Sequence, residues 1–226
     1  GAFVESIDSN QWYVGFVATS ATLMAFKSDI NDVDAFKTLH KGTIEDATAL
    51  TFTNIRDMAI NSENRLLVLD DTNIHKFNVD AALTSNRAIS GIGRFLLNTI
   101  GGRSKSIFDK DKFNTPVSIS IGSNDSIYIL DNEDHGYKVY DKDLNWVSTH
   151  SRRTHYSNLS GGRVTSIAVD RENDNVYVLS NNGILFVYND NGDLIDRTTL
   201  TDPLQLGEEY RQIYFSKKNS DVVYVV

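Results

Sequence analysis

Apolar and polar residues alternate over short segments along most of this chain, and clusters of Ser, Asn, Asp and Gly separate these segments. The pattern is clearest at residues 113–146, where strands are expected at 116–121 (PVSISI), 126–131 (SIYILD) and 137–141 (YKVYD). A period of two is typical of a β-strand with one packed face, and the connectors GSND and NEDHG consist of residues that tolerate tight turns. This stretch predicts an antiparallel meander of three strands.

The same unit recurs along the chain. Its second strand, IYILD at 127–131, has the counterparts LLVLD, VYVLS and VYVV and a looser one, WYVGF, at steps of 47–61 residues. Four-stranded sheets repeated at roughly 40–50 residues are typical of a β-propeller. We therefore expect an all-β chain, folded as a β-propeller of antiparallel three- to four-stranded blades in a single domain, 1–226. About five units are visible, near 3–39, 44–80, 95–150, 160–200 and 208–226.

The second strands are apolar at consecutive positions, which predicts strands covered on both faces, as inside a blade between two neighbours. Residues 146–151 and 193–200 are candidates for fourth strands. The linker 81–115 is longer than the other connections and contains four glycines and a basic stretch, so we expect it to hold a surface insertion. The chain begins with GAF and ends within a strand pattern, VVYVV, so we expect it to be a portion of a longer or processed protein.

Residues 100–147 resemble an NHL repeat. In that family a glycine-containing lead-in precedes F-x-x-P, and an IYVAD-like strand and a segment with a histidine and a final aromatic residue follow. The corresponding residues here are IGG at 100–102, FNTP at 113–116, Asp131, His135 and Tyr140. Gly136 stands where the family has Arg, and the other units keep only the strand periodicity. The resemblance implies an NHL-like or YVTN-like propeller, commonly six-bladed and here incomplete or irregular, but no single activity, because this architecture hosts lyases, lactonases, receptors and inert scaffolds.

Composition narrows the classes of partner and chemistry. The 226 residues carry a formal net charge of -8, a balance that disfavours binding to the phosphates of nucleic acids. No cysteine is present, which excludes disulfides, thiolate metal sites and cysteine nucleophiles, and a cysteine-free chain suits an extracellular or virion setting as well as a reducing one. No apolar run approaches the ~18 residues of a membrane-spanning helix, so no membrane insertion is expected.

The sharpest recurring polar residues are Asp70 and Asp131, which end the second strand of their units. They are candidate metal or substrate ligands, together with His75 and His135 from comparable regions of the same units. The structural alternative is that each aspartate accepts backbone N–H groups of the turn that follows it, and its recurrence favours this alternative. We therefore predict no catalytic residue, metal site or cofactor, and keep these four residues as weak metal candidates.

Two groups of surface residues are candidates for partner binding. The segment SRRTHY at 151–156 combines cationic and aromatic side chains that suit a carboxylate or phosphate on a partner, and the insertion adds a basic stretch. The predicted partner-binding residues are Arg103, Lys105, Arg152, Arg153, His155 and Tyr156. The loop aromatics Trp12, Trp146 and Tyr156 favour carbohydrate binding as an alternative.

Strand periodicity accounts for most of the sequence, and no group of residues has the spacing typical of a catalytic or metal-binding site. The prediction is a non-catalytic propeller that acts as a scaffold or protein–protein interaction module in a larger assembly, such as a phage virion or tail. A metal-dependent propeller hydrolase or lyase with a site in the central channel is the alternative from another class.

Overall fold

The computed structural model describes residues 3–7, 12–17, 22–27, 36–40, 50, 52–79, 81, 92–106, 108–133, 136–151, 162–200, 209–216 and 219–225. Side chains are described for most of 50–200 and for a few residues outside that range. The predicted site residues His135, Arg152, Arg153, His155 and Tyr156 lie outside the described residues, as does the side chain of Trp12.

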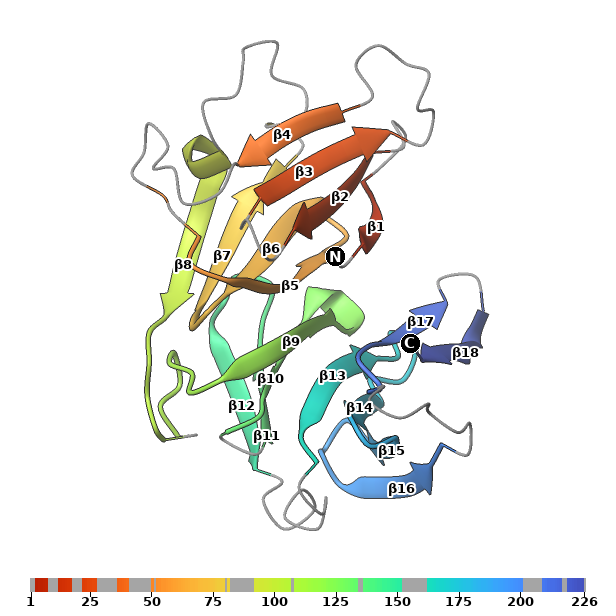
Figure 1. Cartoon of the computed structure of the whole chain (residues 1–226). Helices are drawn as coiled ribbons and strands as arrows, with labels where there is room; N and C mark the ends of the chain where they lie inside the picture. Colours follow the sequence, from red (N-terminus) through yellow and green to blue (C-terminus); the bar gives the residue numbers. More distant parts are fainter. Residues whose placement is uncertain are drawn as a thin grey trace. The chain divides into compact units, whose positions relative to one another are not determined.

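Four antiparallel sheets of four strands, and one strand pair, follow one another through the described residues (Figure 1). The first sheet holds β1 (Phe3–Ile7), β2 (Trp12–Val17), β3 (Thr22–Lys27) and β4 (Phe36–His40). The second holds β5 (Ile55–Ile60), β6 (Arg65–Asp70), β7 (Asn73–Asn78) and β8 (Leu96–Gly101). The third holds β9 (Pro116–Ile121), β10 (Ile127–Asp131), β11 (Gly136–Tyr140) and β12 (Trp146–Ser151). The fourth holds β13 (Val164–Val169), β14 (Val176–Ser180), β15 (Ile184–Tyr188) and β16 (Leu194–Thr199), and the pair is β17 (Ile213–Ser216) with β18 (Asn219–Val225).

Each four-stranded sheet is an up-and-down meander, because every strand pairs with the next one in sequence. Two short 3₁₀ helices, η2 (Ile92–Phe95) and η3 (Ser123–Asp125), complete the elements described in side-chain detail. The prediction of an all-β chain of antiparallel four-stranded units is confirmed. Residues 146–151 and 194–199 form the outer strands of the third and fourth sheets, at the positions expected from the sequence.

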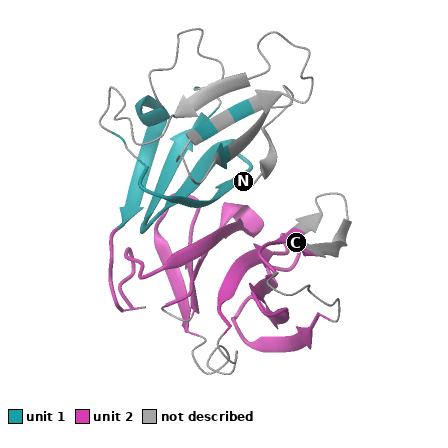
Figure 2. Cartoon of the chain, in the orientation of Figure 1, with its two compact units in different colours: residues 1–101 teal, residues 102–226 magenta. Residues whose placement is uncertain are grey.

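The chain divides into two compact units, Gly1–Gly101 and Gly102–Val226 (Figure 2). The first unit contains the first and second sheets, and the second unit contains the other sheets and the strand pair. The boundary falls inside the predicted insertion: residues 96–101 form β8, which completes the second sheet by pairing with β7. The described residues from Gly102 to Thr115 form a loop that leads into β9.

Apolar side chains fill the space on both faces of the fourth sheet. Val178 of β14 belongs to a cluster that also contains Leu130 and Tyr137 of the third sheet. The next residue, Leu179, belongs to a second cluster with Tyr210 and Ile213 at the start of the strand pair. Successive residues of a strand point to opposite faces, so a strand packed on both sides must be apolar at consecutive positions. This packing is the one predicted for the second strands.

The outer strands share a feature that periodicity does not reveal. In β8, β12 and β16 the pairing register with the neighbouring strand skips the second residue, which is the extra residue of a β-bulge. The skipped residues are Leu97, Val147 and Ile195, with exposed fractions of 52%, 54% and 53%. Each of these three sheets therefore presents one aliphatic side chain to solvent at the same position of its outer strand.

Candidate functional site

The aspartates that end the second strands bind the backbone that enters the first strand of the same sheet. The carboxylate of Asp131 accepts the N–H groups of Asn114 and Thr115 at 2.7 and 3.0 Å. Asp70 accepts those of Thr53 and Asn54 in the same way, at 2.9 and 2.5 Å. Both aspartates are buried. The sequence predicted backbone donors in the turn that follows each aspartate; the donors instead lie 16 and 17 residues before it.

A backbone hydrogen bond closes each of these contacts from the other side. The residue after the aspartate donates its N–H to the carbonyl of the lead-in residue, from Asn132 to Thr115 at 3.1 Å and from Asp71 to Asn54 at 2.9 Å. We call this combination of side-chain and backbone hydrogen bonds the strand-end clamp. It fixes the point at which the chain enters a sheet to the point at which the second strand turns.

The fourth sheet builds the same clamp from a different residue. Ser180 stands where the other two sheets have aspartate, and its hydroxyl bonds within the following turn, to Asn182 and Ile184. The side chain of Asn181 takes over the role of acceptor and receives the N–H of Arg163 at 2.8 Å. The N–H of Asn181 returns to the carbonyl of Arg163 at 2.9 Å. An amide at the next position thus supplies one of the two side-chain hydrogen bonds, so that bond needs an oxygen acceptor and no charge.

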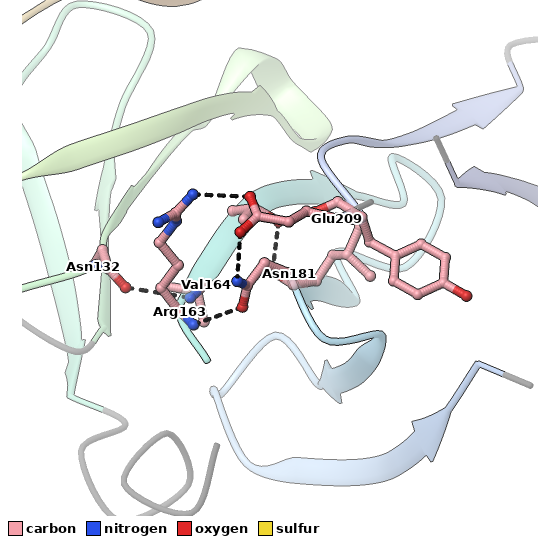
Figure 3. A network of polar contacts seen from close by, with 8 residues as sticks. Asn132, Arg163, Val164, Asn181 and Glu209 are labelled. Atoms are coloured by element: carbon pink, nitrogen blue, oxygen red, sulfur yellow. Dashed lines mark hydrogen bonds and ion pairs between the residues drawn. The ribbon is translucent and has the colours of Figure 1, made fainter. Parts of the chain in front are cut away.

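A polar network joins the clamp of the fourth sheet to the segments beside it (Figure 3). The guanidinium of Arg163 forms an ion pair with Glu209 at 2.9 Å, and the amide of Asn181 donates to the same carboxylate at 3.2 Å. On the other side, the Asn132 side chain accepts the N–H of Val164 at 3.2 Å. The Arg163 and Glu209 side chains are 59% and 36% exposed, so their pairing is a surface interaction of modest energy.

Serine hydroxyls connect the first strands of successive sheets in the second unit. Ser118 of β9 accepts the N–H of Ile167 in β13 at 3.2 Å, and Ser166 of β13 accepts the N–H of Ile213 in β17 at 3.3 Å. Ser118 and Ser166 are each the third residue of their strand. A first strand has a free edge, and this repeated serine satisfies a backbone donor there. The sequence did not single out these residues, although a serine at the third position of both strands was visible.

His75 of β7 is a buried histidine set among aromatic rings. Its ring lies 5.6 Å from that of Phe52 and 6.1 Å from that of Phe77, and its Nδ1 lies 3.0 Å from the Thr99 hydroxyl. Nε2 is buried and has no hydrogen-bond partner. Burial lowers the pKa of His75, with a smaller opposing effect from Asp70. A neutral imidazole is therefore the stable form.

The predicted partner-binding residues Arg103 and Lys105 are both exposed in the loop at 102–115. Two side chains of β11 hold this loop: Lys138 donates to the carbonyls of Asp109 and Lys112, and the hydroxyl of Tyr140 donates to the carbonyl of Lys110. Burial raises the pKa of Tyr140, and so keeps its hydroxyl a donor. Lys138 is fully buried, a position that the sequence did not mark as unusual.

Among the residues whose side chains are described, no group of three His, Asp or Glu could hold a metal ion. The described part of the chain also contains no helix that is both long and apolar enough to cross a bilayer. Trp146, one of the predicted carbohydrate-binding aromatics, donates its Nε1–H to the Thr149 hydroxyl at 3.0 Å. The Lys110 ammonium lies 4.1 Å from the centre of the same ring, so this ring face already has a cationic neighbour.

No protein-family model matches the chain, and no curated protein matches it significantly. Similarity to solved structures is clear: a virginiamycin B lyase from Staphylococcus aureus matches 99% of this chain with a TM-score of 0.60 at 10% identity. A protein of unknown function from Bacteroides caccae matches 95% of the chain with a TM-score of 0.58 at 10% identity. A catalytically inactive form of the same lyase, with quinupristin, matches 93% with a TM-score of 0.57 at 9% identity. The chain covers 62%, 66% and 59% of the length of these three structures.

These similarities establish the fold class. The lyase is a seven-bladed propeller, so the four-stranded sheets of this chain are propeller blades, as predicted. The NHL type of repeat stays a prediction, because no family model supports it. The single-domain organisation and the blade number also stay predictions. At this level of identity, the activity of the lyase does not transfer to this chain.

Proposed function

We propose that this chain is a non-catalytic β-propeller that acts as a scaffold or protein–protein interaction module in a larger assembly. One observation carries the proposal: the acidic residues that the sequence offered as ligands already serve the backbone. Both carboxylate oxygens of Asp70 and of Asp131 accept N–H groups of the lead-in segment. A carboxylate that satisfies two buried donors would leave them unpaired if it turned toward a substrate or a metal ion.

The exposed side chains of the outer strands also support a role in protein–protein interaction. Three blades expose an aliphatic side chain at the same bulge position, and the loop before β9 exposes Phe108 to 79%. Exposed apolar side chains at recurring positions suit contact with other proteins. The partners we propose are proteins, with no role for nucleic acid or for insertion into a membrane. A phage virion or tail is one such assembly, proposed on the general character of the sequence alone.

A metal-dependent hydrolase or lyase is the second candidate, and the similarity to virginiamycin B lyase is the observation that favours it. In that case Asp70, Asp131, His75 and His135 are the residues to examine first. Carbohydrate recognition is a third candidate and has no support beyond the aromatic residues of the sequence.

Thermal unfolding with and without divalent cations separates the first two candidates. A metal that binds the native state at a hundred times its Kd stabilises that state by about 2.7 kcal/mol, which raises Tm by several degrees. We expect the same Tm in excess EDTA and in excess Mg²⁺, Mn²⁺, Ca²⁺ or Zn²⁺. A metal-dependent rise in Tm that Asp131→Asn abolishes would overturn the proposal and favour the enzyme.

A further inference from the structure

The loop before β9 is closed at its base by backbone hydrogen bonds. Arg103 and Phe113 form a bridge, in which the N–H of Phe113 donates to the carbonyl of Gly102 at 3.0 Å and the N–H of Ser104 donates to the carbonyl of Phe113 at 2.9 Å. The loop therefore leaves the blade and returns to it at a single point. We call residues 103–113, of which the structure describes all but Ile107, the plug loop.

Hydrogen bonds within the plug loop and from side chains of β11 hold the loop in place. The Ser104 hydroxyl donates to the Asp109 carboxylate, and the N–H of Asp109 donates to the carbonyl of Ser106 at 3.1 Å. From β11, the buried Lys138 ammonium donates to the carbonyl of Asp109 at 2.8 Å and also to that of Lys112. Burial of an ammonium group is costly unless acceptors surround it, so these carbonyls and the ammonium hold each other in place. The loop is preorganised before any partner arrives.

This fixed loop presents an aromatic side chain in a basic setting. Phe108 is 79% exposed, the largest exposure among the large apolar side chains described. The loop carries four cationic residues and two aspartates, a net charge of +2 on a chain whose total is -8. These charged residues, all exposed, are Arg103, Lys105, Asp109, Lys110, Asp111 and Lys112.

The outer strand of the fourth blade, β16, has the complementary character. Every residue of β16 is exposed, and its bulge brings together Leu194 and Ile195, which are 38% and 53% exposed. The charged residues around this bulge are Asp190, Asp193, Asp196 and Arg197, a net charge of -2. An outer strand also has an unpaired backbone edge, and a bulge leaves its extra residue out of the ladder with the neighbouring strand. We call residues 190–197 the acidic bulge.

We propose that the plug loop of one copy of this chain binds the acidic bulge of a second copy, with Phe108 packed against Leu194 and Ile195. Opposite net charges surround two apolar patches that are both exposed in the same unit. The proposal deepens the function proposed above, and rests on it, by naming a second copy as one protein partner. The contact is small, so it belongs among weak interfaces whose affinity falls as salt is added.

The two surfaces are different, so the contact is heterologous: each copy offers one plug loop and one acidic bulge. Such contacts build rings when the rotation closes and open chains when it does not. Loss of either surface stops growth, but two chains that each lack a different surface still form one contact between them. Recovery of one contact in such a mixture distinguishes this pairing from the effects of unfolding or of nonspecific association.

The test uses sedimentation velocity of the whole chain over a range of concentrations. Phe108→Ser removes the apolar side chain of the plug loop, and Ile195→Ser removes an apolar side chain of the acidic bulge. Leu97→Ser is the matched control, since Leu97 is the equivalent bulge residue of another blade. We expect the wild type and Leu97→Ser to associate in a concentration-dependent manner that high salt weakens. Each of the other two variants should weaken association on the order of tenfold or more, and their mixture should form heterodimers and nothing larger.

A wild-type chain that stays monomeric at low salt and high concentration would overturn the proposal, and so would association that neither Phe108→Ser nor Ile195→Ser weakens. A mixture that grows beyond dimers would equally contradict the pairing of these two surfaces. The melting experiment with divalent cations is independent of this result. If the chain is monomeric and Tm is insensitive to metal, the proposed function stands and only the identity of the partner is wrong.

Discussion

Asp131 ends the second strand of the third blade, and its carboxylate accepts the N–H of Asn114 at 2.7 Å, across 17 residues of the chain. Asp70 makes the equivalent bond to Thr53 over the same separation. An acidic residue that recurs at this position thus binds the backbone of the segment that enters the first strand of its blade. Its recurrence follows from the repeat of the fold and needs no ligand.

Replacement of Asp131 should therefore cost stability. Asp131→Ala leaves the N–H groups of Asn114 and Thr115 without their acceptor in a largely buried site, and we expect a loss of about 2–3 kcal/mol in the free energy of unfolding. Asp131→Asn keeps one oxygen acceptor, as Asn181 does in the fourth blade, and should cost less. Chemical denaturation measures both values. Glu172→Gln, a change at an exposed carboxylate, is the control and should stay within about 0.5 kcal/mol of the wild type.

The inter-blade serines give a second prediction. Ser118→Ala removes the acceptor of the Ile167 N–H, and Ser166→Ala removes that of the Ile213 N–H, so each should lower the free energy of unfolding by about 1–2 kcal/mol. Thr199→Ala removes a hydroxyl from the exposed outer strand β16 and should change stability little. Equal stability of all three variants would show that water replaces these hydroxyls without cost.

His75 predicts a loss of stability in mild acid. Its folded-state pKa lies below the ordinary value of 6.5, so the unfolded chain takes up the proton first as pH falls. The unfolded state then binds more protons than the native state, and the free energy of unfolding decreases as pH falls below about 6.5. Denaturation at about pH 7.5 and about pH 5.5 should show this decrease. His75→Leu should reduce this decrease in the free energy of unfolding. His150→Leu, at a half-buried histidine, is the control and should retain the contribution of His75 to the decrease.

Lys138→Met should release the plug loop while the blade stays folded. Methionine fills much of the lysine volume but cannot donate to the carbonyls of Asp109 and Lys112, which can reach water once the loop separates from β11. Limited trypsin digestion reports the change, because the loop contains four cleavage sites for this protease. We expect faster cleavage within residues 103–112 and an unchanged far-UV CD spectrum. Lys142→Met, at an exposed lysine of the same blade, should leave the cleavage rate at the wild-type value.

The blade pattern could be predicted from the sequence because strand burial leaves a direct trace in it. Val178 and Leu179 pack on opposite faces of the fourth blade, and consecutive apolar residues are the signature of such a strand. The outer strands β12 and β16 were also predictable in position, because each follows a turn rich in Asp and Asn. Repeat spacing together with these patterns was sufficient for the fold class.

The polar contacts were less predictable, because they depend on which segments the fold brings together. Asp131 was recognised as a backbone acceptor, but its donors lie before the first strand, and no local pattern connects residues 114 and 131. Lys138 reads as an ordinary polar position of an alternating strand, yet it is fully buried beneath the plug loop. The exposed bulge residues Val147 and Ile195 depend on strand register, which the sequence does not fix to within one residue.

The central claim is that the strand-end aspartates serve the backbone, and amide hydrogen exchange at Asn114 and Thr115 tests it most directly. In metal-free buffer we predict that both amides are protected in the wild type and exchange on the order of tenfold faster or more in Asp131→Ala. The amides of β14 and β15 in the fourth blade should keep their protection in this variant. Fast exchange of these amides in the wild-type chain, or protection that appears only after a divalent cation is added, would contradict the claim.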